Sequence, residues 1–198
     1  MLKKIIPFLG VLFFAIFILA VSLKTACENP ASIFAMASLK FSVSPSATDS
    51  AKQTVDYYLV YPGILPDHPL YRFKMIRDRI KILLTREPLS RAQLFLLFAD
   101  KRVGAGKVLI EGNKVPLGLS TILKGEKYLE KSISEVSKAK KNGNNTGQIT
   151  EKLAQASLKY EEVFLDLKEK INPEGITAME ESIRFLKLLQ ERIIALSL

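Results

Sequence analysis

From residue 70 onward, hydrophobic residues recur every three or four positions, the spacing that places them on one face of an α-helix. The first segment with this pattern is short, and Pro69 before it suits the first turn of a helix. Its apolar stripe consists of Leu70, Phe73, Ile76, Ile80 and Leu83. The pattern therefore predicts a short amphipathic helix ending before Pro88.

Four longer segments follow, and in them the hydrophobic steps alternate between three and four residues, as in heptad packing. The longer helices begin at Pro88, near Pro116, after Thr146 and at Pro173. The polar run 138–147 predicts a loop, Asn145-Thr146-Gly147-Gln148 predicts a capping box for the helix that follows, and Asn172 caps the last helix. Helices of about 25 residues joined by short turns pack antiparallel. We therefore expect an all-α fold, an up-down bundle of four long helices with the short helix laid against it.

The second helix carries the clearest seam, and we expect it to be central in the bundle. The seam consists of Leu89, Ala92, Leu96, Ala99, Val103, Gly106 and Ile110. Small residues gather in its second half, where another backbone can approach closely: Ala99, Gly104, Ala105 and Gly106.

An uncharged run, Ile5–Leu23, stands between Lys3-Lys4 and Lys24. As a helix it would span about 28 Å, close to the hydrocarbon thickness of a bilayer. Residues 1–24 are therefore interpreted as a signal anchor or a signal peptide, with retention favoured by the length of the run. The lysines before it predict a cytoplasmic N-terminus and a domain outside the cytoplasmic membrane, or a secreted or lipid-anchored domain if the leader is cleaved.

Residues 25–54 are interpreted as a juxtamembrane segment and polar linker, and residues 55–198 as the extracytoplasmic helical domain. The only cysteine, Cys27, cannot close an internal disulfide. Cys27 is either a lipidation site or a juxtamembrane residue without a role. With one cysteine and one histidine, the chain predicts no His/Cys metal site, and no cofactor is expected.

Before the first helix, residues 55–71 combine four tyrosines with three prolines. Prolines favour an extended backbone, and a tyrosine can bury its ring while its hydroxyl group stays hydrogen-bonded to water. One interpretation is a packing strap that closes the open end of the bundle, with Asp67 or His68 capping the helix; the other is a recognition strap. The candidate residues are Tyr57, Tyr61, Pro62, Gly63, Pro66, Asp67, His68, Pro69 and Tyr71.

The formal charge of +9 is unevenly distributed, because residues 71–114 hold eleven Lys or Arg against four Asp or Glu. On the short helix, Lys74, Arg77 and Lys81 share a face away from the apolar stripe, and this possible basic face points at solvent or at a partner. It is either a solvated helix face or a surface for anionic lipid or wall polymers. No nucleic-acid partner is expected, since exposed aromatics do not alternate with the basic residues.

No nucleophile elbow, glycine-rich phosphate loop or zinc-protease motif is present, and no catalytic residue is predicted. Glu126 falls on the seam of the third helix, between Ile122 and Leu129. A buried carboxylate needs a partner, so we expect a core ion pair with Arg79 or Arg102 rather than a catalytic acid.

Two stretches resemble a known family: residues 61–71, YPGILPDHPLY, and residues 94–102, LFLLFADKR, with Arg77-Asp78-Arg79-Ile80 between them. From about Val55 to Ser132 the chain resembles the uncharacterised bacterial family called domain of unknown function 5667. The resemblance implies an extracytoplasmic helical domain behind a signal or anchor. Some relatives resemble the outer halves of anti-sigma regulators, but here only Met1–Lys4 would remain inside, too few to hold a sigma factor.

Together these observations predict a non-catalytic interaction or scaffold module of the cell envelope. Its partners would be the membrane, through residues 5–23, and an envelope protein or anionic polymer, with the oligomeric state left open. The alternative is an exported sensor or ligand-binding domain that uses the strap as a lid, with a pocket lined by Tyr57, Tyr61 and Tyr71. A carboxylate-dependent hydrolase is the weaker third hypothesis.

Overall fold

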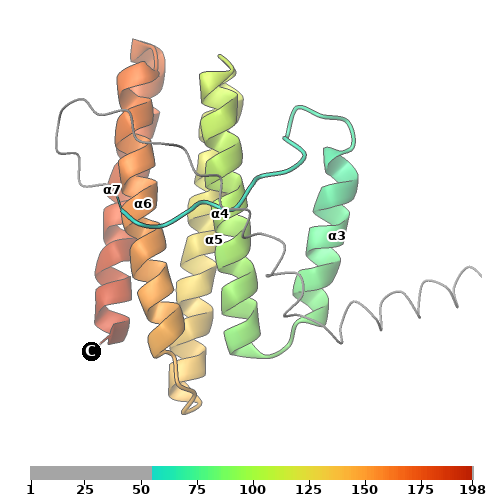
Figure 1. The fold of residues 1–198 in the computed structure, drawn as a ribbon, viewed down its shortest axis with the longest axis vertical. Coiled ribbons are helices and arrows are strands. Elements are labelled where there is room, and N and C mark those ends of the chain that lie inside the picture. Colours follow the sequence, from blue (N-terminus) through green and yellow to red (C-terminus); the bar gives the residue numbers. More distant parts are fainter. Residues whose placement is uncertain (1–54, 198) are drawn as a thin grey trace, which may run out of the picture. The chain divides into compact units, whose positions relative to one another are not determined.

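The computed structural model describes residues 55–197, which contain five helices and no strand (Figure 1). The leader, the linker and Cys27 lie outside the described residues. The helices are α3 (Tyr71–Leu84), α4 (Pro88–Glu111), α5 (Val115–Lys141), α6 (Gly147–Lys170) and α7 (Pro173–Ser197). Residues 52–198 cluster as one compact unit.

Helices α4 to α7 alternate in direction and form a bundle, so the predicted all-α bundle is confirmed (Figure 1). The closest packing is between α4 and α5, followed by α6 with α7 and α5 with α7. The predicted seams form the core, and six of the seven seam positions of α4 are buried, with Leu89 at its edge. The largest fully buried side chains include Tyr160, Phe164, Leu129 and Leu167.

The close approach expected of the small residues on α4 occurs at Gly106. A Cβ atom there would lie 2.5 Å from Cγ1 of Ile122, and one at Gly118 would lie 2.5 Å from Cγ1 of Ile110. Real Cβ atoms do not come so close to carbon, so α4 and α5 can cross at this distance only with glycine on both sides.

One helix start differs in detail from the prediction, and a second, α4, begins at Pro88 as predicted but with a cap that was not predicted. The capping box predicted for Asn145-Thr146-Gly147-Gln148 is wrong, because Oδ1 of Asn145 accepts from the amide of Gly147, and Thr146, which precedes the helix, makes no side-chain capping bond. The start of α4 uses Glu87, whose carboxylate accepts from the amides of Leu89 and Ser90. The Asx turn before α6 and the glutamate cap before α4 each satisfy amides at a helix start that have no partner within the helix.

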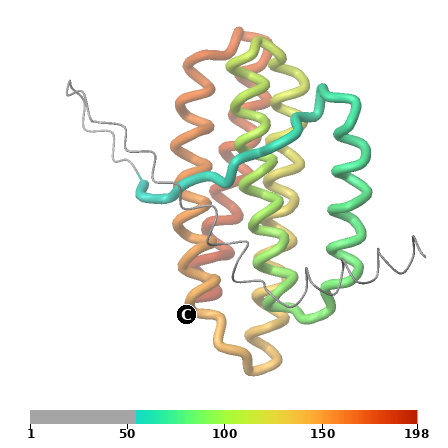
Figure 2. The backbone as a smooth tube through the Cα atoms, turned by 45° about the vertical axis from the view of Figure 1, so that its right-hand side comes forward, coloured from blue at the N-terminus to red at the C-terminus, as the bar shows by residue number. Residues whose placement is uncertain are grey.

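The strap, residues 55–70, runs across the outside of α6 and α4 and then turns into α3 (Figures 1 and 2). The prediction that it closes an open end of the bundle is therefore wrong. Helix α3 lies beside the bundle and makes no extensive backbone contact with any other helix. Within residues 55–197, no helix has the combination of length and apolar character needed to span a bilayer.

Candidate functional site on α3 and the strap

The strap is fixed to the bundle by a buried carboxylate on α4. The hydroxyl of Tyr57 donates to Oδ2 of Asp100 over 2.8 Å, and the hydroxyl of Tyr160 on α6 donates to Oδ1 over 2.5 Å. Burial raises the pKa of Asp100 to about 6, although both phenol hydrogen bonds act to lower it. Burial and the charge of Asp100 together raise the pKa of Tyr57 and of Tyr160. Tyr57 is thus a packing residue of the strap.

Further contacts hold the strap on either side of this point. The amide of Val55 donates to Oε2 of Glu162 on α6 over 3.1 Å. On α4, the strap passes over Gly104, where a Cβ would make an ordinary van der Waals contact of 3.6 Å with the carbonyl oxygen of Val60. The strap therefore rests on α6 first and on α4 second.

At the turn before α3, a lysine side chain replaces the hydrogen bonds that the strap backbone lacks. Nζ of Lys74 donates to the carbonyls of Pro62 (2.5 Å) and Ile64 (3.0 Å), on either side of Gly63 with its φ of +67°. Only 9% of Lys74 is exposed, and burial lowers the pKa of its ammonium group. The positive φ favours glycine at position 63.

The end of the strap is held by its polar residues. Nζ of Lys114 lies 2.6 Å from Oδ2 of Asp67, and this contact lowers the pKa of Asp67. Nδ1 of His68 accepts from the amide of Leu70, so His68 rather than Asp67 serves the start of α3. Pro66 is half-buried and Pro69 is exposed.

The tyrosines of the strap do not form the expected pocket. Tyr58 and Tyr61 are among the exposed aromatic residues, and Tyr71 lies under the guanidinium of Arg102, 5.0 Å from its ring centroid. An open cleft of about 500 Å³ does run beside the strap, but neither Tyr61 nor Tyr71 lines it. Its lining residues are Val55, Asp56, Tyr57, Tyr58, Leu59, Lys107, Lys159 and Val163.

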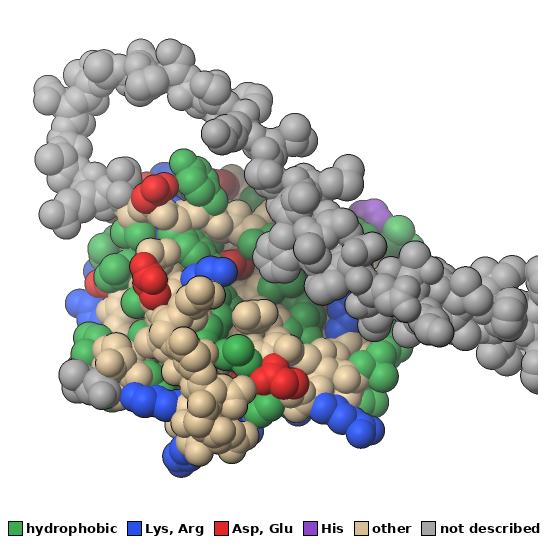
Figure 3. Space-filling view, turned by 60° about the horizontal axis from the view of Figure 1, so that its bottom comes forward, with side chains coloured by type: hydrophobic (Ala, Val, Ile, Leu, Met, Phe, Trp, Pro, Cys, Tyr) green, Lys and Arg blue, Asp and Glu red, His purple; other side chains and the backbone are tan. Residues whose placement is uncertain are grey.

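Helix α3 is turned with its polar side toward the bundle and its apolar side toward solvent. The buried residues of α3 are Lys74 and Asp78. The apolar row of α3, defined as Phe73, Ile76, Ile80, Leu83 and Leu84, is 50–80% exposed. Figure 3 shows hydrophobic side chains on the right-hand side of the molecule, where α3 lies in Figure 1. The prediction of Lys74 on an outward basic face is wrong, whereas Arg77 and Lys81 are exposed.

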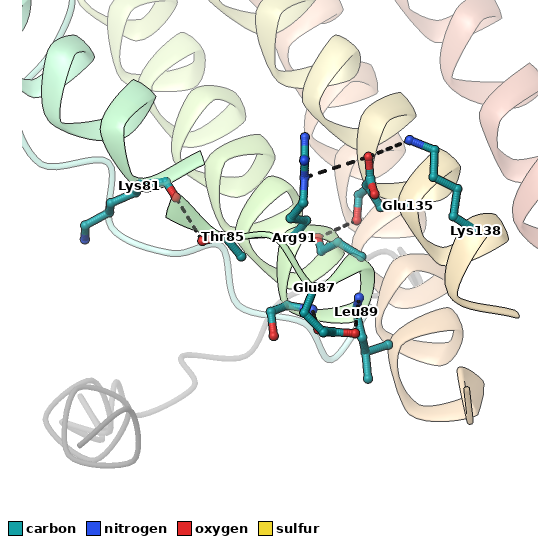
Figure 4. Close-up of polar contacts among 10 residues, drawn as sticks. Lys81, Thr85, Glu87, Leu89, Arg91, Glu135 and Lys138 are labelled. Carbon is teal, nitrogen blue, oxygen red and sulfur yellow. Dashed lines mark hydrogen bonds and ion pairs between the residues drawn. The ribbon is translucent and has the colours of Figure 1, made fainter. Parts of the chain in front are cut away.

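A polar contact with α4 helps to fix this orientation, because Nη2 of Arg102 donates to Sδ of Met75 over 2.8 Å. Within α3 itself, Arg77 pairs with its neighbour Asp78 over 2.9 Å. At the other end of α3, the hydroxyl of Thr85 donates to the carbonyl of Lys81 (Figure 4). Figure 4 also shows Glu135 of α5 between Arg91 and Lys138, near the start of α4. On α4, Lys101 lies close enough to Asp78 of α3 for their charges to attract each other.

A basic cleft of about 240 Å³ adjoins α3, and sequence reasoning missed it. It is lined by Met75, Arg102, Lys124, Lys127, Tyr128 and Lys131. Only 4% of Arg102 is exposed, burial lowers its pKa, and no carboxylate within residues 55–197 pairs with it. The three lysines on α5 likewise form no ion pair with a described residue. Unneutralised cations of this kind attract an anionic group.

Glu126 is fully buried, but the expected core ion pair is wrong. Arg102 turns toward the basic cleft and Arg79 is exposed on α3. Neither oxygen of Glu126 has a hydrogen-bond partner among the described residues. Burial raises its pKa to about 8, and Ser182 nearby offsets part of this effect. The carboxyl group is therefore neutral at pH 7, as the surrounding hydrocarbon requires.

The chain is similar to a known family. A family model described as Domain of unknown function (DUF5667) matches residues 63–174, more than half of the 198 residues. The match confirms the resemblance and extends it through α6, well beyond Ser132. Neither curated proteins nor solved structures contained a match. Within residues 55–197, no group of three His, Cys, Asp or Glu side chains is placed to hold a metal ion.

Proposed function

This chain belongs to that family of unknown function, and from this premise we propose that it is a membrane-tethered interaction module of the bacterial cell envelope, without a catalytic role. Its helical domain would lie outside the cytoplasmic membrane, held there by residues 5–23. The uncharged run at these residues supports the tether. The observation that carries the interaction role is the apolar row of α3.

The apolar row supports a binding role because the bundle leaves it uncovered although its own core is closed. Isolated exposed apolar residues are ordinary, but a continuous row on one helix marks an interaction face. The row is held outward by the contacts of Lys74 and Arg102, so it is available without any rearrangement. A preformed face binds a partner at a lower entropic cost than one that must first be ordered.

The tether is tested with the full chain in bacterial cells. We expect it in the membrane fraction after alkaline carbonate extraction, with the helical domain digested by protease added to spheroplasts. Recovery of the intact chain from the cytosol, or protection of the domain in spheroplasts, would contradict the proposal. The leader fused to an unrelated reporter domain serves as the control for export alone.

The interaction role is tested by accessibility in the same cells. Both test proteins carry Cys27→Ser, so that the introduced cysteine is the only one. The cysteine is introduced either by Ile80→Cys on α3 or, as the matched control, by Leu158→Cys on α6. The two positions are comparable because Ile80 and Leu158 are each about half exposed. A membrane-impermeant maleimide should label the control in cells but label Ile80→Cys much more slowly than in the purified chain. Equal labelling of Ile80→Cys in cells and in solution would show an unoccupied row and contradict the role.

A further inference from the structure

We infer that the partner of the apolar row is an anionic lipid surface, on which α3 lies flat as an interfacial helix. The row would enter the boundary between head groups and acyl chains, and the basic residues beside it would contact lipid phosphates. This inference rests on the proposed function, because it names the partner of the same face.

The arrangement of α3 matches that of a helix lying in a membrane interface. At 3.6 residues per turn, the apolar row covers an arc of about 100° on the side opposite Lys74 and Asp78. Arg72 and Arg79 border one edge of this arc, and Arg77 and Lys81 border the other. All four are exposed. An apolar arc between two basic edges places hydrocarbon in the acyl region while the long basic side chains reach the phosphates.

Charge distinguishes lipid from the other possible occupants. The one acidic residue of α3, Asp78, is 4% exposed and paired, and the basic cleft beside Met75 adds four more cations. A second copy of the chain would bring an equally cationic face against this one. Residues 1–54 hold five lysines against two acids, so they too offer no complementary charge. An anionic leaflet complements both the row and its edges.

The predicted span places a membrane within reach of α3. Residues 24–54 separate the span from the described domain, and a chain of this length can bridge at most about 100 Å, so it permits α3 to reach the bilayer. A tether of this length keeps α3 at a high effective concentration near the bilayer, so weak interfacial binding is sufficient to dock it. Each basic residue near an anionic surface strengthens binding about fivefold.

The first experiment uses purified residues 52–198, which form one compact unit with a closed core of their own. We expect this domain to float with vesicles containing phosphatidylglycerol and not with phosphatidylcholine alone. The double variant Ile76→Glu/Ile80→Glu should weaken binding at least 10-fold, and Arg72→Gln/Arg79→Gln about 10- to 25-fold. Leu158→Glu/Leu188→Glu, on α6 and α7, is the matched control and should bind as the unaltered domain does. Circular dichroism verifies that each variant is folded.

Several results would overturn the inference. One is absence of binding to anionic vesicles, or equal loss in the control and in the α3 variants. Another is a dimer in solution that the α3 variants abolish, since the row would then be covered by a second copy. Binding that ignores the arginine pair would likewise show that the anionic lipid is not recognised.

The second experiment separates failure of this inference from failure of the tether. The full chain with Cys27→Ser and Ile80→Cys carries a nitroxide at position 80 and is reconstituted into anionic vesicles. We expect the label to be accessible to oxygen and shielded from an aqueous nickel chelate, unlike a label at Leu158→Cys. If the chain inserts into the membrane but the label is exposed to water, the inference about lipid binding is wrong and the proposed tether stands. If the full chain does not insert but residues 52–198 still bind vesicles, the tether is wrong and the inference stands.

Discussion

Helix α3 and the bundle α4–α7 have the same type of sequence pattern but face opposite ways. The bundle helices turn their apolar seams inward, and Ile122, Leu129 and Leu153 are completely buried. Helix α3 turns Lys74 and Asp78 inward and exposes its apolar row. The spacing of hydrophobic residues therefore shows that a helix has an apolar and a polar face. Which face is buried depends on the surface against which the helix packs.

The physical reason lies in what α4 and the strap offer to α3. The carbonyls of Pro62 and Ile64 need donors, and Lys74 supplies them. Lys101 on α4 favours an acid on the side of α3 that faces it, where Asp78 lies. Burying the apolar row against these groups instead would leave several polar atoms without partners, at about 1–3 kcal/mol each.

The largest effect that separates the two regions is expected from a pair of matched truncations. Phe164→Ala on α6 removes a completely buried ring and should lower the free energy of unfolding by about 3–5 kcal/mol. Phe73→Ala on α3 removes a 70% exposed ring and should change it by less than about 0.5 kcal/mol. Urea denaturation followed by circular dichroism measures both. Similar losses would show that the apolar row is part of the core.

The second prediction concerns pH and the core alone. The native state keeps Glu126 protonated up to about pH 8, whereas the unfolded chain ionises it above its usual pKa. The free energy of unfolding should therefore fall as the pH rises toward 8, by about 1–3 kcal/mol between pH 6 and 8. The pKa of Asp100 is also raised, to about 6, so ionisation of Asp100 in the unfolded chain lowers the free energy of unfolding in the same direction, but below pH 6.

Glu126→Gln removes the titrating group and should flatten the profile between pH 6 and 8. Urea denaturation at several pH values compares the variant with the unaltered chain. Glu87→Gln is the control, because this carboxylate is exposed and its pKa is lowered rather than raised. A profile for Glu126→Gln that stays as steep as that of the unaltered chain would refute the buried neutral carboxyl.

The third prediction tests how firmly the strap belongs to the bundle. Tyr57→Phe removes the hydrogen bond to Asp100 and leaves a half-buried ring in place, which should cost about 1 kcal/mol. Tyr61→Phe, at an exposed residue, is the matched control and should have no measurable effect. Equal stability of both variants in thermal and urea unfolding would mean that the strap is not held through Asp100.

The smallest effect is expected within α3 itself. Lys74→Met keeps the apolar stem but removes both hydrogen bonds to the strap, so amides of α3 should exchange about fivefold faster. Amides of α5 and α7 should keep their protection. Hydrogen exchange with mass spectrometry resolves the two regions, and Arg79→Met, an exposed neighbour, is the control. Faster exchange throughout the bundle would show that α3 and the core open as one unit.

The sequence predicts the bundle well because seam spacing, prolines and polar loops are local signals. All seven seam positions predicted for α6, from Ile149 to Ile171, are buried. The cluster of Tyr57, Asp100 and Tyr160 could not be predicted, since its members lie 43 and 60 residues apart and share no local pattern. Tyr160 was expected only as one residue of a seam.

The basic cleft could be predicted in part from the sequence. Lys124, Lys127 and Lys131 stand at three- and four-residue steps, so their common face on α5 was visible in advance. Arg102 and Met75 come from two other helices, and only the fold brings them to this face. The expected pairing of Arg102 with Glu126 failed for the same reason, because spacing does not tell which side of α4 faces α5.

The route of the strap has a mechanical consequence. The chain enters the domain sideways at Val55, against the flank of α6, and crosses α4 before α3 begins (Figure 2). A force that pulls on the chain before Val55 would load the hydrogen bond from Val55 to Glu162 first. The hydrogen bond from Tyr57 to Asp100 would be loaded only after the first one had broken. Contacts loaded in succession yield at low force, so the strap would peel off and lengthen the chain while α4–α7 remained folded.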